Sequence, residues 1–165
     1  MKPVVKLLIV ANLVALFIYL ALSVDRKETL IAEGDLLLLQ LAPVDPRSLM
    51  QGDYMTLDYA IEREAAKLNR KLDGQQAGYV VVRPDSLGVA QLIRLQPKLG
   101  TLDDGEFALP FRANRFQLDI GAGSYFFQEG RAYEFARAQY GGLRVDETGD
   151  AVLIGLYDKE RTLIK

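Results

Sequence analysis

The sequence predicts an α+β protein, mostly β, in which an N-terminal transmembrane helix precedes a β-rich domain with two short helices. An uncharged apolar run occupies Leu7–Val24 near the N-terminus. Most later apolar segments are short and separated by turn residues, which is typical of strands. Two further segments, 61–72 and 130–139, follow the spacing of a helix instead. The pattern leaves open whether the sheet is open or a partly closed barrel.

The run Leu7–Val24 is long enough to span a bilayer. As a helix, its 18 residues rise about 27 Å, close to the roughly 30 Å of a hydrocarbon core. We therefore divide the chain into a cytoplasmic tip with its anchor, residues 1–24, and an exported β-rich domain, residues 25–165, and expect residues 4–24 to contact lipid. Asn12 is strongly polar, and we expect it either to be tolerated in the span or to contact a partner helix.

A cleaved signal peptide is the alternative interpretation of this run. Ala21-Leu22-Ser23 provides a small-x-small pattern at which cleavage could occur. The apolar region of a signal peptide normally spans about 7–15 residues, however. The greater length of the run favours an uncleaved anchor.

The charges around the run predict its orientation. Lys2 and Lys6 precede it, whereas residues 25–28 carry no net charge. By the positive-inside rule the N-terminus stays in the cytoplasm and the domain crosses the membrane. In a bacterium this describes a single-pass inner-membrane protein with a periplasmic, or otherwise extracytoplasmic, C-terminal domain. The absence of cysteine means that the domain folds without disulfides.

Composition excludes several classes of function. Without Lys2 and Lys6 the chain has 18 basic and 22 acidic residues, a net charge of about −4, and the two signs are interspersed. This distribution argues against nucleic-acid binding and against a strong electrostatic hold on anionic lipid. With no His and no Cys, the usual catalytic triads and soft-metal sites are excluded. We expect no cofactor and no metal, since the spacing of Asp45, Asp53 and Asp58 is not that of a known Ca²⁺ loop.

The expected elements of the domain are short. Strands are predicted at 35–45, 55–61, 78–85, 88–97, 107–112, 115–120 and on both sides of a turn at 147–150. The helix 61–72 carries Ile61, Ala65, Leu68 and Leu72 on its apolar face and ends near Gly74. The helix 130–139 places Tyr133, Ala136 and Tyr140 on one stripe, and Gly141-Gly142 are expected to end it.

The stretch DPRSLMQGDYMTLDY, residues 45–59, could belong to an enzyme. Leu49-Met50-Gln51-Gly52-Asp53 resembles the Leu-x-x-Gly-Asp turn of signal peptidases, in which a preceding Ser-Met-x-Pro segment supplies the nucleophile and a Lys acts as base. Aligning Pro46 with that proline places Pro43 at the position of the nucleophile, and Pro43 has no hydroxyl. Ser48 is out of register. A Ser/Lys hydrolase stays an alternative, and we assign no catalytic residue.

A structural role explains the same residues more fully. Asp45-Pro46 begins a turn, because Asp accepts backbone N–H bonds and Pro fixes φ. Gly52 allows a positive φ at no steric cost, and Asp53 can cap freed backbone donors. Tyr54, Leu57 and Tyr59 then enter a strand as large residues. We therefore favour a protein that is not an enzyme.

The octapeptide 52–59 spells G-D-Y-x-x-L-x-Y in full. Together with the N-terminal span, the lead-in at 41–54 and the tail YFFQEGRAYEFARAQYGGLRVDETGDAVLIGL at 125–156, it resembles the GDYXXLXY family of bacterial membrane-anchored proteins over nearly the whole chain. The resemblance implies a multi-pass inner-membrane protein as partner, because members are usually encoded beside such proteins. The family has no assigned biochemical activity, so the resemblance implies no catalytic residue.

Two surfaces are candidates for binding. Gly52, Asp53, Tyr54, Leu57 and Tyr59 form the first, built on the motif. The second lies within 124–144 and comprises Tyr125, Phe127, Glu129, Tyr140 and Arg144. These rings either complete the core or line a groove beside the motif that holds a partner. A small-ligand binder is a third possibility and would show a deep apolar pocket.

Overall fold

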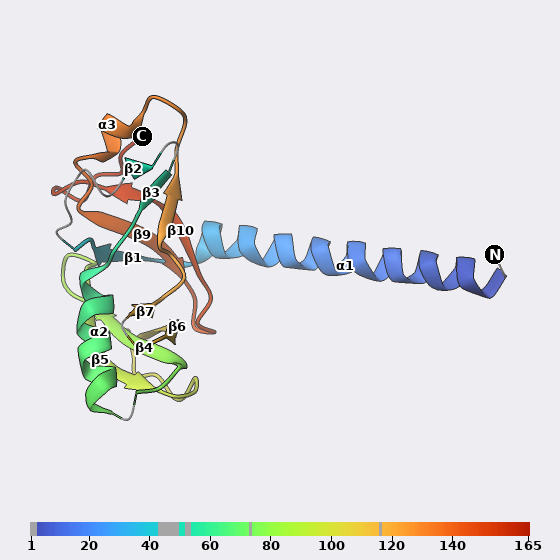
Figure 1. Cartoon of the computed structure of the whole chain (residues 1–165), viewed down its shortest axis with the longest axis horizontal. Coiled ribbons are helices and arrows are strands. Elements are labelled where there is room, and N and C mark those ends of the chain that lie inside the picture. Colours follow the sequence, from blue (N-terminus) through green and yellow to red (C-terminus); the bar gives the residue numbers. More distant parts are fainter. Residues whose placement is uncertain (1–2, 43–49, 52–53, 73, 116) are drawn as a thin grey trace.

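A computed structural model describes residues 3–42, 50–51, 54–72, 74–115 and 117–165. Helix α1 (Pro3–Glu33) projects as a long rod from a β-rich domain, and the longest direction of this domain lies across the helix axis (Figure 1). The described strands form two sheets of three strands and one of four, and none of these sheets closes into a barrel. The predicted α+β class, mostly β with an N-terminal helix, is confirmed.

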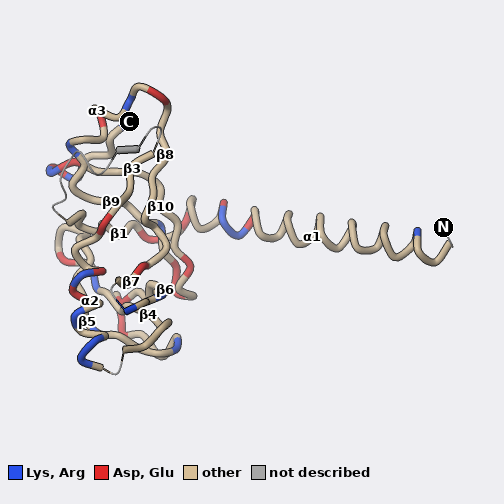
Figure 2. Tube along the Cα trace, viewed as in Figure 1, with Lys and Arg blue, Asp and Glu red and all other residues tan. Residues whose placement is uncertain are grey.

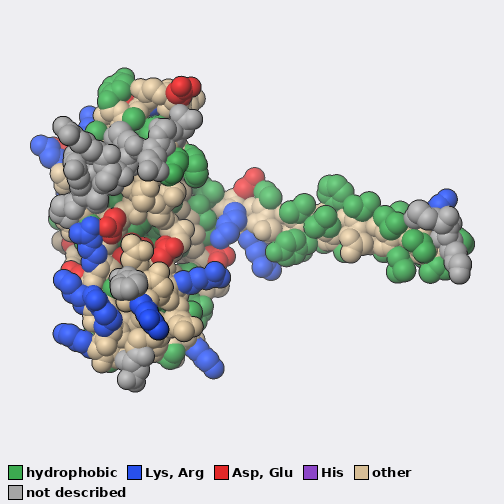
Figure 3. Space-filling view, viewed as in Figure 1, with side chains coloured by type: hydrophobic (Ala, Val, Ile, Leu, Met, Phe, Trp, Pro, Cys, Tyr) green, Lys and Arg blue, Asp and Glu red, His purple; other side chains and the backbone are tan. Residues whose placement is uncertain are grey.

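Helix α1 contains the whole uncharged run and continues past it to Glu33. Between Lys6 and Asp25 it carries no charged side chain (Figure 2), and hydrophobic side chains make up much of the face seen in Figure 3. No residue of its most apolar window is buried by the rest of the protein. In the described part of the chain it is the one helix long and apolar enough to cross a membrane, as an anchor or as a signal sequence.

The first sheet pairs the first strand of the domain with its last two strands. Its antiparallel strands are β1 (Asp35–Gln40), β9 (Tyr140–Val145) and β10 (Ala151–Tyr157), in the order β1-β9-β10. Leu37, Leu143 and Leu153 lie in register across the three strands. The carboxylate of Asp146 accepts hydrogen bonds from the backbone N–H groups of Thr148 and Asp150, each at 2.9 Å, which confirms the predicted turn between β9 and β10.

Gly141 and Gly142 lie within β9 and do not end a helix, so this prediction was wrong. Helix α3 comprises only Ala132–Phe135. A Cβ atom on Gly141 would lie 2.7 Å from the hydroxyl of Tyr59, and one on Gly142 would overlap the ring of Tyr157. Because successive strand residues face opposite sides of a sheet, the two glycines make room for one ring on each face.

The second sheet contains the motif. Its strands are β2 (Met50–Gln51), β3 (Tyr54–Thr56) and β8 (Ser124–Phe126), in the order β2-β3-β8. The predicted strand 55–61 ends early, because helix α2 (Ala60–Lys71) begins at Ala60. The predicted alternation of burial is nevertheless correct, since Met55, Leu57 and Tyr59 are all buried.

The third sheet has the order β5-β4-β6-β7 and packs against α2. Its strands are β4 (Ala77–Pro84), β5 (Ala90–Gln96), β6 (Phe107–Ala113) and β7 (Leu118–Asp119), and the predicted β4–β5 hairpin is confirmed. On α2, Ile61 and Ala65 are buried as predicted, but Leu72, which follows the last residue of the helix, is exposed. Asn69 is buried in its place, because its amide bonds the backbone of Gln75 through both its oxygen and its nitrogen.

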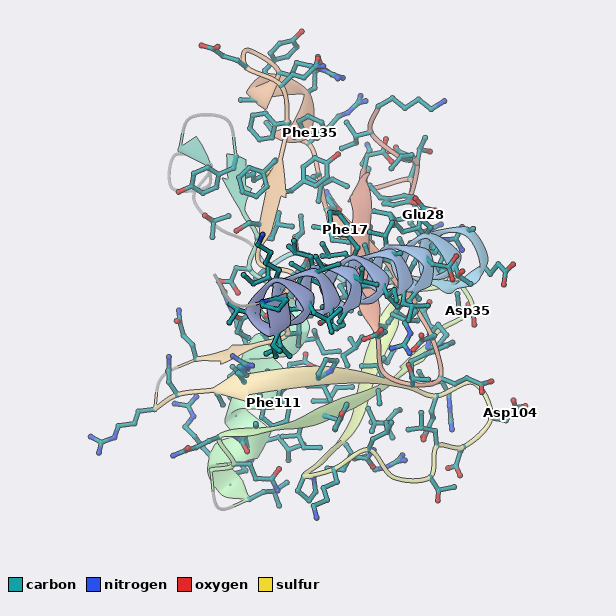
Figure 4. The ribbon with its side chains drawn as sticks, turned by 90° about the vertical axis from the view of Figure 1, so that its right-hand side faces the viewer. Phe17, Glu28, Asp35, Asp104, Phe111 and Phe135 are labelled. Carbon is teal, nitrogen blue, oxygen red and sulfur yellow. The ribbon has the colours of Figure 1, made fainter. Side chains whose placement is uncertain are left out.

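One hydrophobic core connects the three sheets. It includes Leu37 of β1, Val80 of β4, Leu109 of β6 and Phe135 of α3. Viewed from the side on which α1 projects, Phe135 lies above the helix and Phe111 below it (Figure 4). The core therefore extends across the line of the helix and holds the two ends of the domain together.

Candidate binding surface

Leu57 and Tyr59 of the motif are core residues, so a partner on the surface does not reach them. Both side chains are buried, and the hydroxyl of Tyr59 donates a hydrogen bond of 3.0 Å to the carbonyl oxygen of Ala122. Burial raises the pKa of Tyr59, and the nearby carboxylate of Glu62 raises it further. The surface role predicted for these two residues is replaced by a structural one. Gly52 and Asp53 lie outside the described residues.

Glu62 holds the start of α2 against the end of β7, a role that the sequence pattern did not predict. One of its carboxylate oxygens accepts the N–H of Tyr59 at 3.3 Å, and the other accepts the N–H of Ile120 at 3.0 Å. Burial raises the pKa of Glu62 to about 7, although the two N–H donors lower it, and Asp119 and Asp58 add smaller upward shifts. The spacing Tyr59-x-x-Glu62 is that of a capping box, but Tyr is not a usual N-cap residue, so the signal was weak.

The remaining motif tyrosine contributes to what we call the aromatic end. This group lies on β3, β8 and the segment that follows β8, and it comprises Tyr54, Tyr125, Phe126, Phe127 and Phe135. Its rings occupy both faces of the β3–β8 pair. On the inner face, the ring centroid of Phe135 lies 5.3 Å from that of Tyr125 and 5.2 Å from that of Phe127. On the outer face, the ring centroids of Tyr54 and Phe126 lie 5.7 Å apart.

The two faces of the aromatic end differ in exposure. Phe135 is buried and belongs to the core, with Tyr125 and Phe127 packed against it. Phe126, in contrast, exposes 74% of its surface. Because strand side chains alternate between faces, the neighbours Tyr125 and Phe126 necessarily point to opposite sides. The inner rings therefore stabilise the fold, and the exposed ring of Phe126 on the outer face can contact another molecule.

A shallow hollow of about 400 Å³ lies beside these rings and is lined in part by Arg131. The guanidinium of Arg131 lies 5.8 Å from the ring centroid of Phe135, pairs with the carboxylate of Glu134, and donates to the carbonyl oxygen of Lys165 at 2.6 Å. Hydrogen bonding to Arg131 lowers the pKa of Glu134. The charge of Arg131 is thus already compensated, and the hollow is suited to apolar or aromatic groups.

The structure separates the other predicted binding residues. Glu129 is exposed in the loop between β8 and α3, close in the chain to Phe127. Tyr140, on β9, packs in a separate apolar cluster with Leu38 and Tyr157. Arg144 lies where α1 meets the domain, so it is not part of an aromatic groove.

Arg144 belongs to a contact that we call the helix joint, which comprises Lys27, Leu30, Gly34, Arg144 and Asp150. The guanidinium of Arg144 donates to the carbonyl oxygen of Gly34 at 2.6 Å, and Leu30 is buried. Lys27 and Asp150 form an ion pair with an N–O distance of 3.6 Å. A Cβ atom on Gly34 would lie 2.5 Å from the carbonyl oxygen of Leu30, so the chain can turn from helix to strand here only at glycine.

The helix joint also forms one wall of a hollow of about 640 Å³ between α1 and the β9–β10 turn. Its lining is largely charged and includes Asp25, Arg26, Glu33, Asp146 and Glu147. Among the described residues, no group of three or more carboxylates is arranged to hold a metal ion. Ser48, on which a hydrolase would depend, and two of the three aspartates considered for Ca²⁺, Asp45 and Asp53, lie outside the described residues.

Fold and surface together define a β-rich domain carried on an N-terminal apolar helix, with its motif tyrosines divided between core and surface. The family described as GDYXXLXY protein matches residues 16–156. The chain therefore belongs to the GDYXXLXY family, and the resemblance noted in its sequence is confirmed. The match begins inside α1, so Asn12 precedes it. No curated protein and no solved structure matches the chain.

Proposed function

We propose that this protein is a single-pass accessory subunit that binds a multi-pass protein of the bacterial inner membrane and catalyses no reaction itself. Its N-terminus lies in the cytoplasm, α1 stays attached as a signal anchor, and the domain lies in the periplasm. The observation that carries the proposal is the uncovered surface of α1. Over its most apolar window the helix is not buried by any other described part of the chain, so its whole circumference is available to lipid and to other helices.

Asn12 is the residue of α1 that we assign to the partner. Its side chain is exposed and makes no hydrogen bond to any part of the chain that the structure describes. It lies five residues inside the uncharged run, about 7.5 Å along the helix from Leu7. Water is absent at that depth, so an amide side chain gains most from a hydrogen bond across a helix–helix interface.

The helix joint supports an accessory role rather than a loose tether. Leu30, Gly34 and Arg144 fix the last turn of α1 against β9. A partner that binds α1 in the membrane therefore also determines where the domain is held. A rigid arrangement of this kind suits a subunit that supports or covers a membrane protein.

Affinity purification from detergent-solubilised membranes tests the proposal, with wild type, Asn12→Leu and Ser23→Leu compared. Ser23→Leu is the matched control, because it replaces another polar and exposed residue of α1 by leucine. We expect wild type and Ser23→Leu to recover the same integral-membrane protein. A hydrogen bond between helices in a membrane is worth about 0.6–2 kcal/mol, so Asn12→Leu should recover about 3- to 30-fold less.

Two results would contradict the proposal at different levels. Recovery of no membrane protein with wild type contradicts the accessory role itself. Equal recovery with wild type and Asn12→Leu contradicts the assignment of Asn12 and leaves the partner in place.

A further inference from the structure

We propose that the outer ring pair of the aromatic end, Tyr54 and Phe126, rests in the lipid headgroup region beside α1. The domain then contacts the bilayer at a second point, some distance from its anchor. This inference goes beyond the proposed function, because it concerns lipid and requires no protein partner. It depends only on α1 crossing the membrane.

The domain lies crosswise on α1. α1 leaves from the middle of the domain, and the longest direction of the domain runs across the helix axis (Figure 1). A helix that crosses the bilayer therefore lays one broad side of the domain along the membrane surface. Strand β8 lies on this side, above the point from which α1 projects (Figures 2 and 4).

Only a short length of α1 separates the domain from the hydrocarbon. The nine residues Asp25–Glu33 continue α1 past the uncharged run and rise about 13 Å. The headgroup layer on each side of a bilayer occupies about 5–8 Å of that length. The domain thus begins within about two helical turns of the headgroups. Membrane helices tilt by about 20° on average, which lowers one end of such a crosswise domain further.

The outer rings are of the chemical type that favours a membrane interface. Phe126 is a large ring that is 74% exposed, and it lies against the ring of Tyr54. Aromatic side chains favour the boundary between headgroups and acyl chains, where an apolar ring is partly removed from water and a hydroxyl stays hydrated. This contact needs no basic patch, which agrees with the net charge of about −4 beyond Lys6.

The chain suits a direct test, because it contains no tryptophan. Phe126→Trp introduces a single tryptophan at the proposed contact, and its emission can be excited separately from that of the eight tyrosines. Tyr133→Trp is the matched control, because Tyr133 is similarly exposed, at 76%, but lies on α3, on the far side of the aromatic end from α1 (Figure 1). Each full-length variant is reconstituted into phosphatidylcholine vesicles, with or without bromine atoms on the acyl chains near the headgroup.

We expect bromination to reduce the emission of Phe126→Trp about twofold and the emission of Tyr133→Trp hardly at all, since quenching requires contact with the upper acyl chain. Equal emission of Phe126→Trp in both kinds of vesicle would overturn the lipid contact. The purification of a partner would be unaffected by that result, so the two proposals fail separately.

A second probe covers the case in which tryptophan disturbs β8. The chain contains no cysteine, so Phe126→Cys carries a single nitroxide label. In the same unbrominated vesicles the label should be more accessible to oxygen, which dissolves in lipid, than a label at Tyr133→Cys. Equal accessibility at the two positions also overturns the proposal.

Discussion

Replacement of Gly141 by alanine should destabilise the domain by overpacking the contact between β9 and the motif. The added methyl group would lie 2.7 Å from the hydroxyl oxygen and 2.9 Å from a ring carbon of Tyr59, whereas ordinary contacts measure 3.4–4 Å. Tyr59 is 0% exposed, so its ring cannot move out into solvent to make room. Overpacking of this kind costs about 1–3 kcal/mol. For a domain of this size, about 2 kcal/mol lowers the melting temperature by roughly 8 °C.

A double-mutant cycle with Tyr59→Phe locates the cause. Tyr59→Phe alone removes the hydrogen bond to Ala122, which costs about 1 kcal/mol. It also removes the atom nearest to the new methyl group. The double variant should therefore lose about 1 kcal/mol less than the sum of the single variants.

The assay is thermal unfolding of the full-length protein in detergent, followed by near-ultraviolet circular dichroism of the aromatic rings. Gly123→Ala is the control, because the nearest atom to its added methyl group is 3.8 Å away. It should change stability by less than about 0.5 kcal/mol. The reasoning is refuted if Gly141→Ala unfolds at the wild-type temperature, or if its cost and that of Tyr59→Phe are additive.

Three further predictions follow from particular contacts. Because the pKa of Glu62 is raised from 4.5 to about 7 in the fold, the melting temperature should fall as the pH rises between these values and then level off. Glu62→Gln should flatten this fall. An unchanged pH profile in this variant would contradict the assignment of the fall to Glu62. Gly34→Ala should expose the helix joint to limited proteolysis, because the added methyl group would collide with the carbonyl of Leu30. The melting temperature of the domain should change little. Cleavage of the variant at the wild-type rate would contradict this role of Gly34. Phe126→Ser should cost only about 0.2–1 kcal/mol of unfolding free energy, because the largely exposed ring loses only its cross-strand contact with Tyr54, and a loss of about 3 kcal/mol or more would place Phe126 in the core.

The elements that the sequence predicted correctly are those with local causes. An uncharged run as long as Leu7–Val24 specifies a membrane-length helix whatever follows it. Turn residues between short apolar runs specify the β4–β5 and β9–β10 hairpins, and Asp146 accepts the hydrogen bonds that such a turn needs. The alternation of Met55, Leu57 and Tyr59 likewise gave their buried face correctly.

The incorrect predictions have causes that are distant in the chain. Gly141 and Gly142 resemble a helix stop, and only the rings of Tyr59 and Tyr157 reveal them as space within a strand. Asn69 is buried because its side chain bonds the backbone of Gln75, beyond the end of α2. Helical periodicity does not predict a hydrogen bond of this kind.

The candidate surface could be predicted only in part. An aromatic-rich segment at 124–144 was evident, but its residues divide between core, surface and helix joint. The direction in which β8 crosses the core leaves Phe126 exposed and turns Tyr125 toward Phe135. That direction depends on pairing with β3, on a distant part of the chain, so composition alone does not determine it.

Labelling of a single cysteine tests the central claim, that α1 stays attached and holds the domain outside the cytoplasm. Glu147→Cys, in the exposed β9–β10 turn, would be the sole cysteine of the chain. A maleimide that cannot cross membranes is applied to intact spheroplasts, and the washed membranes are then analysed by mass. The account predicts a labelled protein of full-length mass in the membrane fraction. Labelling only after lysis, or a labelled protein that lacks α1 in the soluble fraction, would contradict it.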